Sequence, residues 1–125
     1  MKDAFGELYK DLELIEADLN DEASMIAACE GANYVIHTAS PFFMDKPKDA
    51  KKELFDPAIN GTTCIMKGCH KFKVEKCVIT SSTVAAIMSK DLNVNSYGPD
   101  SWSDPEACDD YFLSKLLAEK AAWDF

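Results

Sequence analysis

The sequence of 125 residues lacks a long apolar run, and it is short of positive charge. No stretch could cross a bilayer, and residues 1–10 lack the apolar core of a secretion signal. A formal net charge of −9 disfavours nucleic acid or an anionic membrane as the main partner. We therefore expect a cytoplasmic protein that binds neither a membrane nor nucleic acid.

Cysteine occurs only five times, and an odd number does not suit a disulfide framework. One group of residues could be imagined as a zinc site: Cys64, Cys69, His70 and Cys77. The sequence has no Cys-x-x-Cys pair, however, and Cys77 falls in a predicted buried strand. We expect reduced thiols and no metal site.

Glycine is sparse where a phosphate-binding turn would need it. The five glycines are Gly6, Gly31, Gly61, Gly68 and Gly98. None has the GxGxxG or GxxGxxG spacing that brings the backbone of an α/β fold close to a bound pyrophosphate. The sequence therefore contains no glycine-rich phosphate-binding turn.

Strand and helix patterns alternate along the rest of the chain. The predicted strands are Leu12–Ala17, Tyr34–Thr38 and Lys76–Thr80. Such alternation is typical of an α/β protein with a parallel sheet, and 125 residues is the size of one domain. In folds of this class, ligands bind at the carboxyl ends of the strands.

The helical segments have recognisable ends. Asn20 or Asp21 can cap the first helix, and Gly31 supplies the stop after it. Residues 48–70 carry an apolar stripe, within which Pro57 predicts a kink or a break. Residues 89–105 form a long loop, and loops of that length in a compact domain are usually functional.

The final helical segment carries Tyr111 and Lys115, whose spacing places both side chains on one helix face. A fixed ammonium group stabilises the phenolate form of a tyrosine and makes it a better proton donor. Tyr and Lys are common in helices, so this spacing alone also fits an ordinary half-buried helix. The strand before the long loop ends in Ser81 and Ser82, which period-two alternation places on opposite faces.

A strand ending in Ser82, an irregular segment and a Tyr-x-x-x-Lys helix together resemble the short-chain dehydrogenase/reductases. The strings Val78-Ile79-Thr80-Ser81-Ser82, Trp102-Ser103-Asp104 and Tyr111-xxx-Lys115-xxx-Glu119-xxx-Trp123 resemble the extended branch. Within it they are most similar to the dihydroflavonol reductase, cinnamoyl-CoA reductase and ketone reductase group. The resemblance covers nearly all of the chain.

That resemblance implies a partial Rossmann-type parallel sheet, with strands 3 to 5 of the family fold and their flanking helices. It places the first two strands, the glycine loop and the C-terminal substrate domain outside the sequence, so residues 1–125 would be a partial NAD(P)-binding domain. In the order 3-2-1-4-5-6 the absent strands separate Leu12–Ala17 from Tyr34–Thr38. We expect these two segments to have unpaired edges or to pair directly.

The resemblance also implies an enzyme that transfers hydride from a nicotinamide cofactor to a small ketone or aldehyde. Ser82 would hydrogen-bond the carbonyl oxygen and Tyr111 would deliver the proton. Lys115 would assist Tyr111 and bind the nicotinamide ribose. NADP is favoured as the cofactor and NAD stays open, because the residues that read the 2′-phosphate follow the absent second strand.

Further cofactor contacts follow from the same resemblance. Asp18 and Leu19 match the position that contacts adenine, although Asp18 could instead cap the next helix. The turn after the next strand passes beneath the cofactor and comprises Thr38, Ala39 and Ser40. Asn60 resembles a helix asparagine near the active-site water chain, and His37 is interpreted as a packed strand residue.

Several alternatives stay open. The chain could belong to an epimerase, a dehydratase or a hydroxysteroid dehydrogenase of the same branch, against which Trp102-Ser103-Asp104 argues. It could also be a truncated, non-catalytic product that binds partners through exposed strand edges, which the missing glycine loop favours. A hydrolase triad of Ser82 and His37 lacks the GxSxG turn, and the adjacent Asp109 and Asp110 point to different helix faces.

Overall fold

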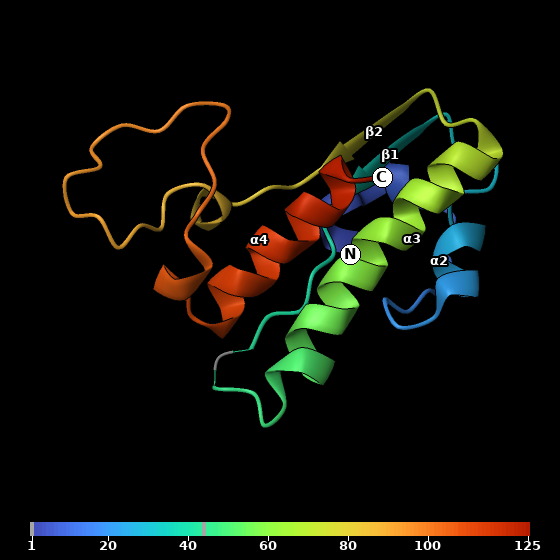
Figure 1. Ribbon diagram of the computed structural model, residues 1–125. Coiled ribbons are helices and arrows are strands. Elements are labelled where there is room, and N and C mark those ends of the chain that lie inside the picture. Colours follow the sequence, from blue (N-terminus) through green and yellow to red (C-terminus); the bar gives the residue numbers. More distant parts are fainter. Residues whose placement is uncertain (1, 44) are drawn as a thin grey trace.

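A computed structural model describes residues 2–43 and 45–125, and Figure 1 shows its arrangement. The elements in chain order are α1 (Lys2–Phe5), η1 (Gly6–Asp11), α2 (Glu22–Ala27), β1 (Tyr34–His37), η2 (Lys51–Phe55), α3 (Asp56–Phe72), β2 (Lys76–Ile79), η3 (Thr83–Ala85), η4 (Pro105–Ala107) and α4 (Asp110–Trp123). No helix in the described part of the chain is long and apolar enough to cross a membrane.

The centre of the fold is a βαβ unit. Strands β1 and β2 run parallel, with Tyr34 opposite Lys76 and His37 opposite Ile79, and α3 forms the crossover between them. Beyond the last pair, the Thr80 amide donates to the His37 carbonyl at 3.0 Å. The prediction of an α/β fold with a parallel sheet is confirmed.

The segment Leu12–Ala17 is not a strand, so that prediction was wrong. It has no regular secondary structure, and the side chains of Leu14 and Ile15 are 62% and 55% exposed. A strand exists only through its hydrogen-bonded neighbour, and within residues 2–43 and 45–125 the sheet has two strands that pair with each other. Of the two alternatives expected for this segment, direct pairing with Tyr34–Thr38 does not occur among the described residues.

The ends of α2 and the start of α3 lie close to the residues that the sequence predicts as helix boundaries. The Asp21 carboxylate accepts hydrogen bonds from the amides of Ala23 and Ser24, so this residue caps α2. Gly31, with φ of 76°, takes the left-handed conformation in the turn that follows. The predicted interruption near Pro57 is a change of helix type, because the π-helix η2 gives way to α3 at Asp56. Pro57 lies in the first turn of α3, where its missing amide hydrogen costs little.

The core lies between α2, α3 and the sheet. Its buried residues are Met25, Cys29, Cys64, Ile65 and Cys69. A Cβ atom added at Gly68 would lie 2.7 Å from the Cys29 sulfur, so α2 and α3 approach closely at this point. All five cysteines are free thiols, and burial together with neighbouring thiols raises the pKa of Cys69 to about 12.

One face of the sheet is covered and the other is open. Helices α3 and α4 lie on one side of the strands, as Figure 1 shows, and Val35 and Cys77 pack toward the core. On the other face Tyr34, Ile36 and Val78 are 66%, 72% and 47% exposed. This leaves an apolar sheet surface in contact with solvent in the described structure.

Candidate functional site

The candidate site lies where β1 and β2 end, opposite one face of α4. A small cavity of about 50 Å³ is lined by residues at the ends of β1 and β2, by Thr62 on α3 and by one face of α4. The lining residues are His37–Ser40 at and after the end of β1, Ile79–Ser82 at and after the end of β2, Thr62 on α3, and Lys115, Ala118 and Glu119 on α4. The structure thus brings the predicted residues Ser82, Lys115 and Thr38 to Ser40 to one place, as expected for ligands at the carboxyl ends of parallel strands.

Lys115 is the cationic residue that lines this cavity, and Glu119 is the acidic one. Lys115 is partly buried on α4 between Ser114 and Leu116, whose side chains are fully buried. Burial lowers the pKa of Lys115, since the ammonium form loses hydration that the protein does not fully replace. Its Nζ atom lies 5.5 Å from the centre of the Tyr111 ring. Lys115 therefore reaches Tyr111 and also lines the cavity that contains Ser82.

Tyr111 stands one helical turn before Lys115, in a different cavity. The Asp109 carboxylate caps α4 by accepting from the Phe112 amide at 2.8 Å, which places Tyr111 in the first turn. Its ring contacts Phe42 edge to face, with centres 5.4 Å apart. The neighbouring cavity of about 400 Å³ is lined by Phe43, Asp45, Lys46, Pro47, Leu54, Asp109, Asp110 and Tyr111.

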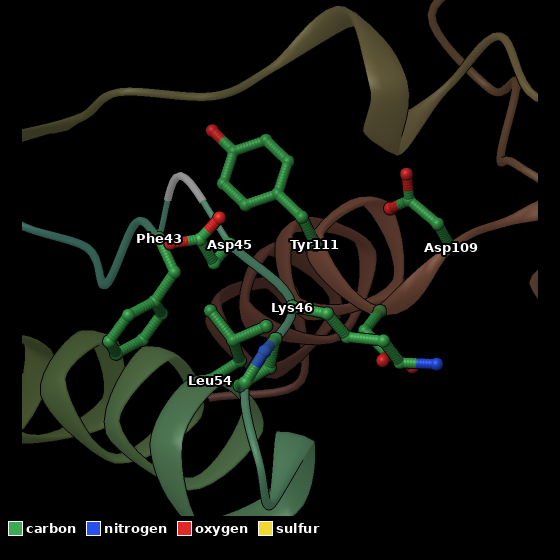
Figure 2. Close-up of a pocket in the computed structure, with 8 residues that line it drawn as sticks. Phe43, Asp45, Lys46, Leu54, Asp109 and Tyr111 are labelled. Atoms are coloured by element: carbon green, nitrogen blue, oxygen red, sulfur yellow. The ribbon is translucent and has the colours of Figure 1, made fainter.

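Figure 2 shows the Tyr111 hydroxyl pointing upward, away from Leu54, which lies below the Tyr111 ring in this view. Tyr111 does not share the small cavity with Ser82; the two lie in adjacent cavities, and Lys115 connects them. In the absence of a bound molecule, catalytic contacts of this kind are often longer than hydrogen bonds.

The two serines after β2 have different surroundings. The Ser81 hydroxyl donates a hydrogen bond to the Glu119 carboxylate, which ties the strand end to α4. Ser82 has extended backbone angles and precedes η3, and its carbonyl accepts from the Ala85 amide at 3.0 Å. Glu119 was not predicted as a site residue, although its spacing of i+4 from Lys115 could have indicated it. Thr62 also lines the cavity, and nothing in the sequence pattern points to it.

His37 is a packed strand residue, as interpreted from the sequence. It is only 7% exposed at the end of β1. Burial lowers the pKa of His37, and the positive charge of Lys115 lowers it further. Both effects favour the neutral form of the His37 imidazole, which lines the small cavity.

Asp18, Leu19 and Asn60 lie away from the small cavity. The Asp18 carboxylate accepts from the Asn20 amide at 2.8 Å, whereas Asp21 caps α2, so the alternative reading of Asp18 as the cap was wrong. Leu19 packs on α3 so closely that a Cβ atom at Gly61 would lie 2.4 Å from its Cδ2 atom. Leu19 and Asn60 share a separate cavity of about 220 Å³, so the structure does not bring Asn60 to the cavity of Ser82 and Lys115.

Residues 2–123 match the family described as the 3-beta hydroxysteroid dehydrogenase/isomerase family. This chain belongs to that family. The match includes every element of the site, from the turn after β1 to α4. It agrees with the resemblance to extended short-chain dehydrogenase/reductases that the sequence indicates.

Several curated proteins similar to this chain are plant reductases. The chain is 36% identical to an anthocyanidin reductase of Arabidopsis thaliana, over 92% of this chain and 36% of the relative. It is 37% identical to a dihydroflavonol 4-reductase of the same plant, over 91% of this chain and 31% of the relative. The chain thus spans about a third of the length of the curated relatives it matches.

A solved structure with the same arrangement is the yeast methylglyoxal/isovaleraldehyde reductase Gre2, complexed with NADPH. It is 30% identical with a TM-score of 0.78, and the match covers 99% of this chain and 41% of Gre2. This chain is therefore similar to several reductases, one of which has been observed with NADPH bound.

Proposed function

We propose that this chain is part of an NADP-dependent reductase that transfers hydride to a small ketone or aldehyde. Ser82, Tyr111 and Lys115 are its catalytic residues. The observation that carries the proposal is the position of Lys115, which lies 5.5 Å from the Tyr111 ring centre and lines the cavity of Ser82. The names of the relatives and the NADPH bound to Gre2 support it.

Each of the three residues has a distinct task in the proposed reaction. The bound cofactor supplies a hydride to the carbonyl carbon. The Ser82 hydroxyl donates a hydrogen bond to the carbonyl oxygen as negative charge develops there. Tyr111 transfers its hydroxyl proton to that oxygen, which yields the alcohol, and the Lys115 ammonium stabilises the phenolate that remains.

The residues of this chain fit one end of a nicotinamide cofactor. Thr38, Ser40 and Lys115 provide hydroxyls and an ammonium group suited to a ribose. At about 50 Å³ the cavity accommodates a water molecule rather than a nicotinamide ring, so binding requires it to widen. The sequence has no glycine-rich turn for the pyrophosphate, and we assign that contact to residues outside this chain.

The proposal also assigns the domain and the other cofactor contacts of this chain. Residues 1–125 form a partial NAD(P)-binding domain, in which Asp18 and Leu19 contact adenine and Thr38, Ala39 and Ser40 pass beneath the cofactor. NADP is favoured, and NAD stays open because the residues that read the 2′-phosphate are not in this chain.

A second candidate function is a non-catalytic product that binds a protein partner. The exposed apolar sheet face formed by Tyr34, Ile36 and Val78 favours it, since such a surface in a folded protein marks an interaction site or an association hazard. The two candidates differ in one respect that can be measured, which is turnover of a reduced nicotinamide cofactor.

The deciding experiment follows NADPH oxidation by the protein at its full natural length, with a panel of ketones and aldehydes. We expect oxidation with at least one carbonyl compound, and its loss in Tyr111→Phe. Tyr97→Phe is the matched control, because Tyr97 lies exposed in the long loop. Tight NADPH binding without turnover of any carbonyl compound would contradict the proposal.

A further inference from the structure

We propose that Ser103 is a positioning residue for Ser82, and that Trp102-Ser103-Asp104 is a clamp holding the segment after β2 in its reactive geometry. This inference rests on the proposed role of Ser82. The tripeptide lies in the long loop between η3 and α4, and it does not line the small cavity. Its influence on the reaction is therefore indirect.

Ser103 lies in a loop, yet it is buried and makes three hydrogen bonds to backbone groups of another segment. Its side chain is 2% exposed, and its hydroxyl donates to the Val84 carbonyl at 2.7 Å. The same hydroxyl accepts from the Met88 amide at 2.8 Å, and the Ser103 amide donates to the Ala85 carbonyl at 2.9 Å. One residue thus satisfies three backbone groups in and just after η3.

These bonds act on the segment that begins with Ser82. Helix η3 starts directly after Ser82, and the Ala85 amide donates back to the Ser82 carbonyl at 3.0 Å. Ala85 is 2% exposed, and η3 packs against α4, the helix of Tyr111 and Lys115. Ser103 therefore holds η3 from one side while α4 supports it from another, which fixes the backbone of Ser82 relative to Lys115.

The flanking residues attach the same tripeptide to two more elements. The Nζ atom of Lys120 on α4 lies 5.4 Å from the centre of the Trp102 ring, a cation–π contact. The Asp104 amide donates to the Met88 carbonyl at 2.7 Å, and the Asp104 carboxylate accepts from the Glu106 amide at 2.9 Å. Ser103 and Asp104 thus both bond to Met88, and Trp102 contacts α4.

A serine suits this position for a chemical reason. The site needs one donor and one acceptor on a small side chain, and a hydroxyl provides both. Ser103→Ala leaves the Val84 carbonyl and the Met88 amide without their side-chain partner in a buried place. The segment after β2 then gains freedom, and a displacement of about 1 Å at a catalytic group can cost roughly 100-fold in rate.

The first test uses kinetics of the protein at its full natural length with a carbonyl compound that it reduces. We expect Ser103→Ala to lower kcat about ten-fold or more while the KM for NADPH changes less than about two-fold. Ser101→Ala is the matched control: the Ser101 hydroxyl accepts from the Gly98 amide at 2.8 Å within the same loop and makes none of the bonds to η3. An unchanged kcat in Ser103→Ala would overturn the proposal.

A double-mutant cycle separates positioning from a general loss of structure. If Ser103 acts through Ser82, the variant Ser82→Ala/Ser103→Ala has the same kcat as Ser82→Ala alone. If the two effects multiply, Ser103 does not act through Ser82 and the proposal is wrong.

Amide hydrogen exchange of this chain provides a readout that does not depend on activity. We expect Ser103→Ala to accelerate exchange at Ala85 and Met88 by about ten-fold or more while α3 amides stay unchanged. Unchanged exchange at Ala85 and Met88 would refute the clamp. Faster exchange in a protein that reduces no carbonyl compound would refute the proposed function and keep the clamp.

Discussion

The Nζ atom of Lys115 lies 5.5 Å from the centre of the Tyr111 ring, while Tyr111 and Ser82 line adjacent cavities. Lys115 therefore joins the two halves of the candidate site. This position gives it two tasks in the proposed reaction, one toward the Tyr111 phenolate and one toward the cofactor ribose. Tyr111 has only the first, and the difference can be measured.

We expect Tyr111→Phe to abolish carbonyl reduction and to leave NADPH affinity within about two-fold, because only the proton donor is removed. Lys115→Ala should lower both turnover and NADPH affinity. Steady-state kinetics and titration calorimetry of the protein at its full natural length provide the two measurements. An equal loss of cofactor affinity in the two variants would show that this division of tasks is wrong.

The second prediction concerns pH. Burial and the charge of Lys115 hold the pKa of His37 below its ordinary value of 6.5. Between that lowered pKa and 6.5, the unfolded chain binds more protons at this residue than the folded chain, so the contribution of His37 to stability falls as pH drops through this window. Urea unfolding of the chain at several pH values measures this loss.

His37→Gln should make stability less dependent on pH in that window, because glutamine does not titrate. His70→Gln is the matched control, since His70 is exposed on α3. Identical pH profiles for the wild type and His37→Gln would mean that His37 does not titrate differently on unfolding.

The third prediction tests the packing of α2 on α3. A Cβ atom at Gly68 would lie 2.7 Å from the Cys29 sulfur and 3.1 Å from the Ile26 carbonyl oxygen. Gly68→Ala should therefore lower the free energy of unfolding by about 1–3 kcal/mol, although Ala normally favours a helix interior. Gly98→Ala is the control, because nothing lies within 4 Å of an added Cβ atom there. If the Gly68→Ala chain had the same free energy of unfolding as the wild type, α2 would be able to move away from α3 without loss of stability.

The fourth prediction concerns the 125-residue chain by itself. Without a glycine-rich turn it lacks close backbone contacts to a pyrophosphate, so we expect weak or undetectable NADPH binding and no reductase activity. Titration calorimetry of a purified monomeric sample measures the binding. Micromolar affinity for NADPH with one site per chain would show that NADPH binding does not need contacts outside these residues.

Much of the local structure could be predicted from the sequence, because the determining interactions span only a few residues. Asp21 and Gly31 delimit α2 and the turn after it through their own side-chain and backbone preferences. Tyr111 and Lys115 share a face of α4 because that follows from helical spacing alone. The strands β1 and β2 were predicted to within one residue at their ends.

Only the tertiary structure decided the features that depend on distant partners. Leu12–Ala17 has the sequence pattern of a strand, but the described residues contain no strand that pairs with it, so the pattern does not produce a strand. The buried hydroxyl of Ser103 and the contact between Ser81 and Glu119 join segments whose proximity no local pattern encodes. The sequence by itself determined that Tyr111 and Lys115 share a helix face, whereas long-range packing determined that Lys115 also lines the cavity of Ser82.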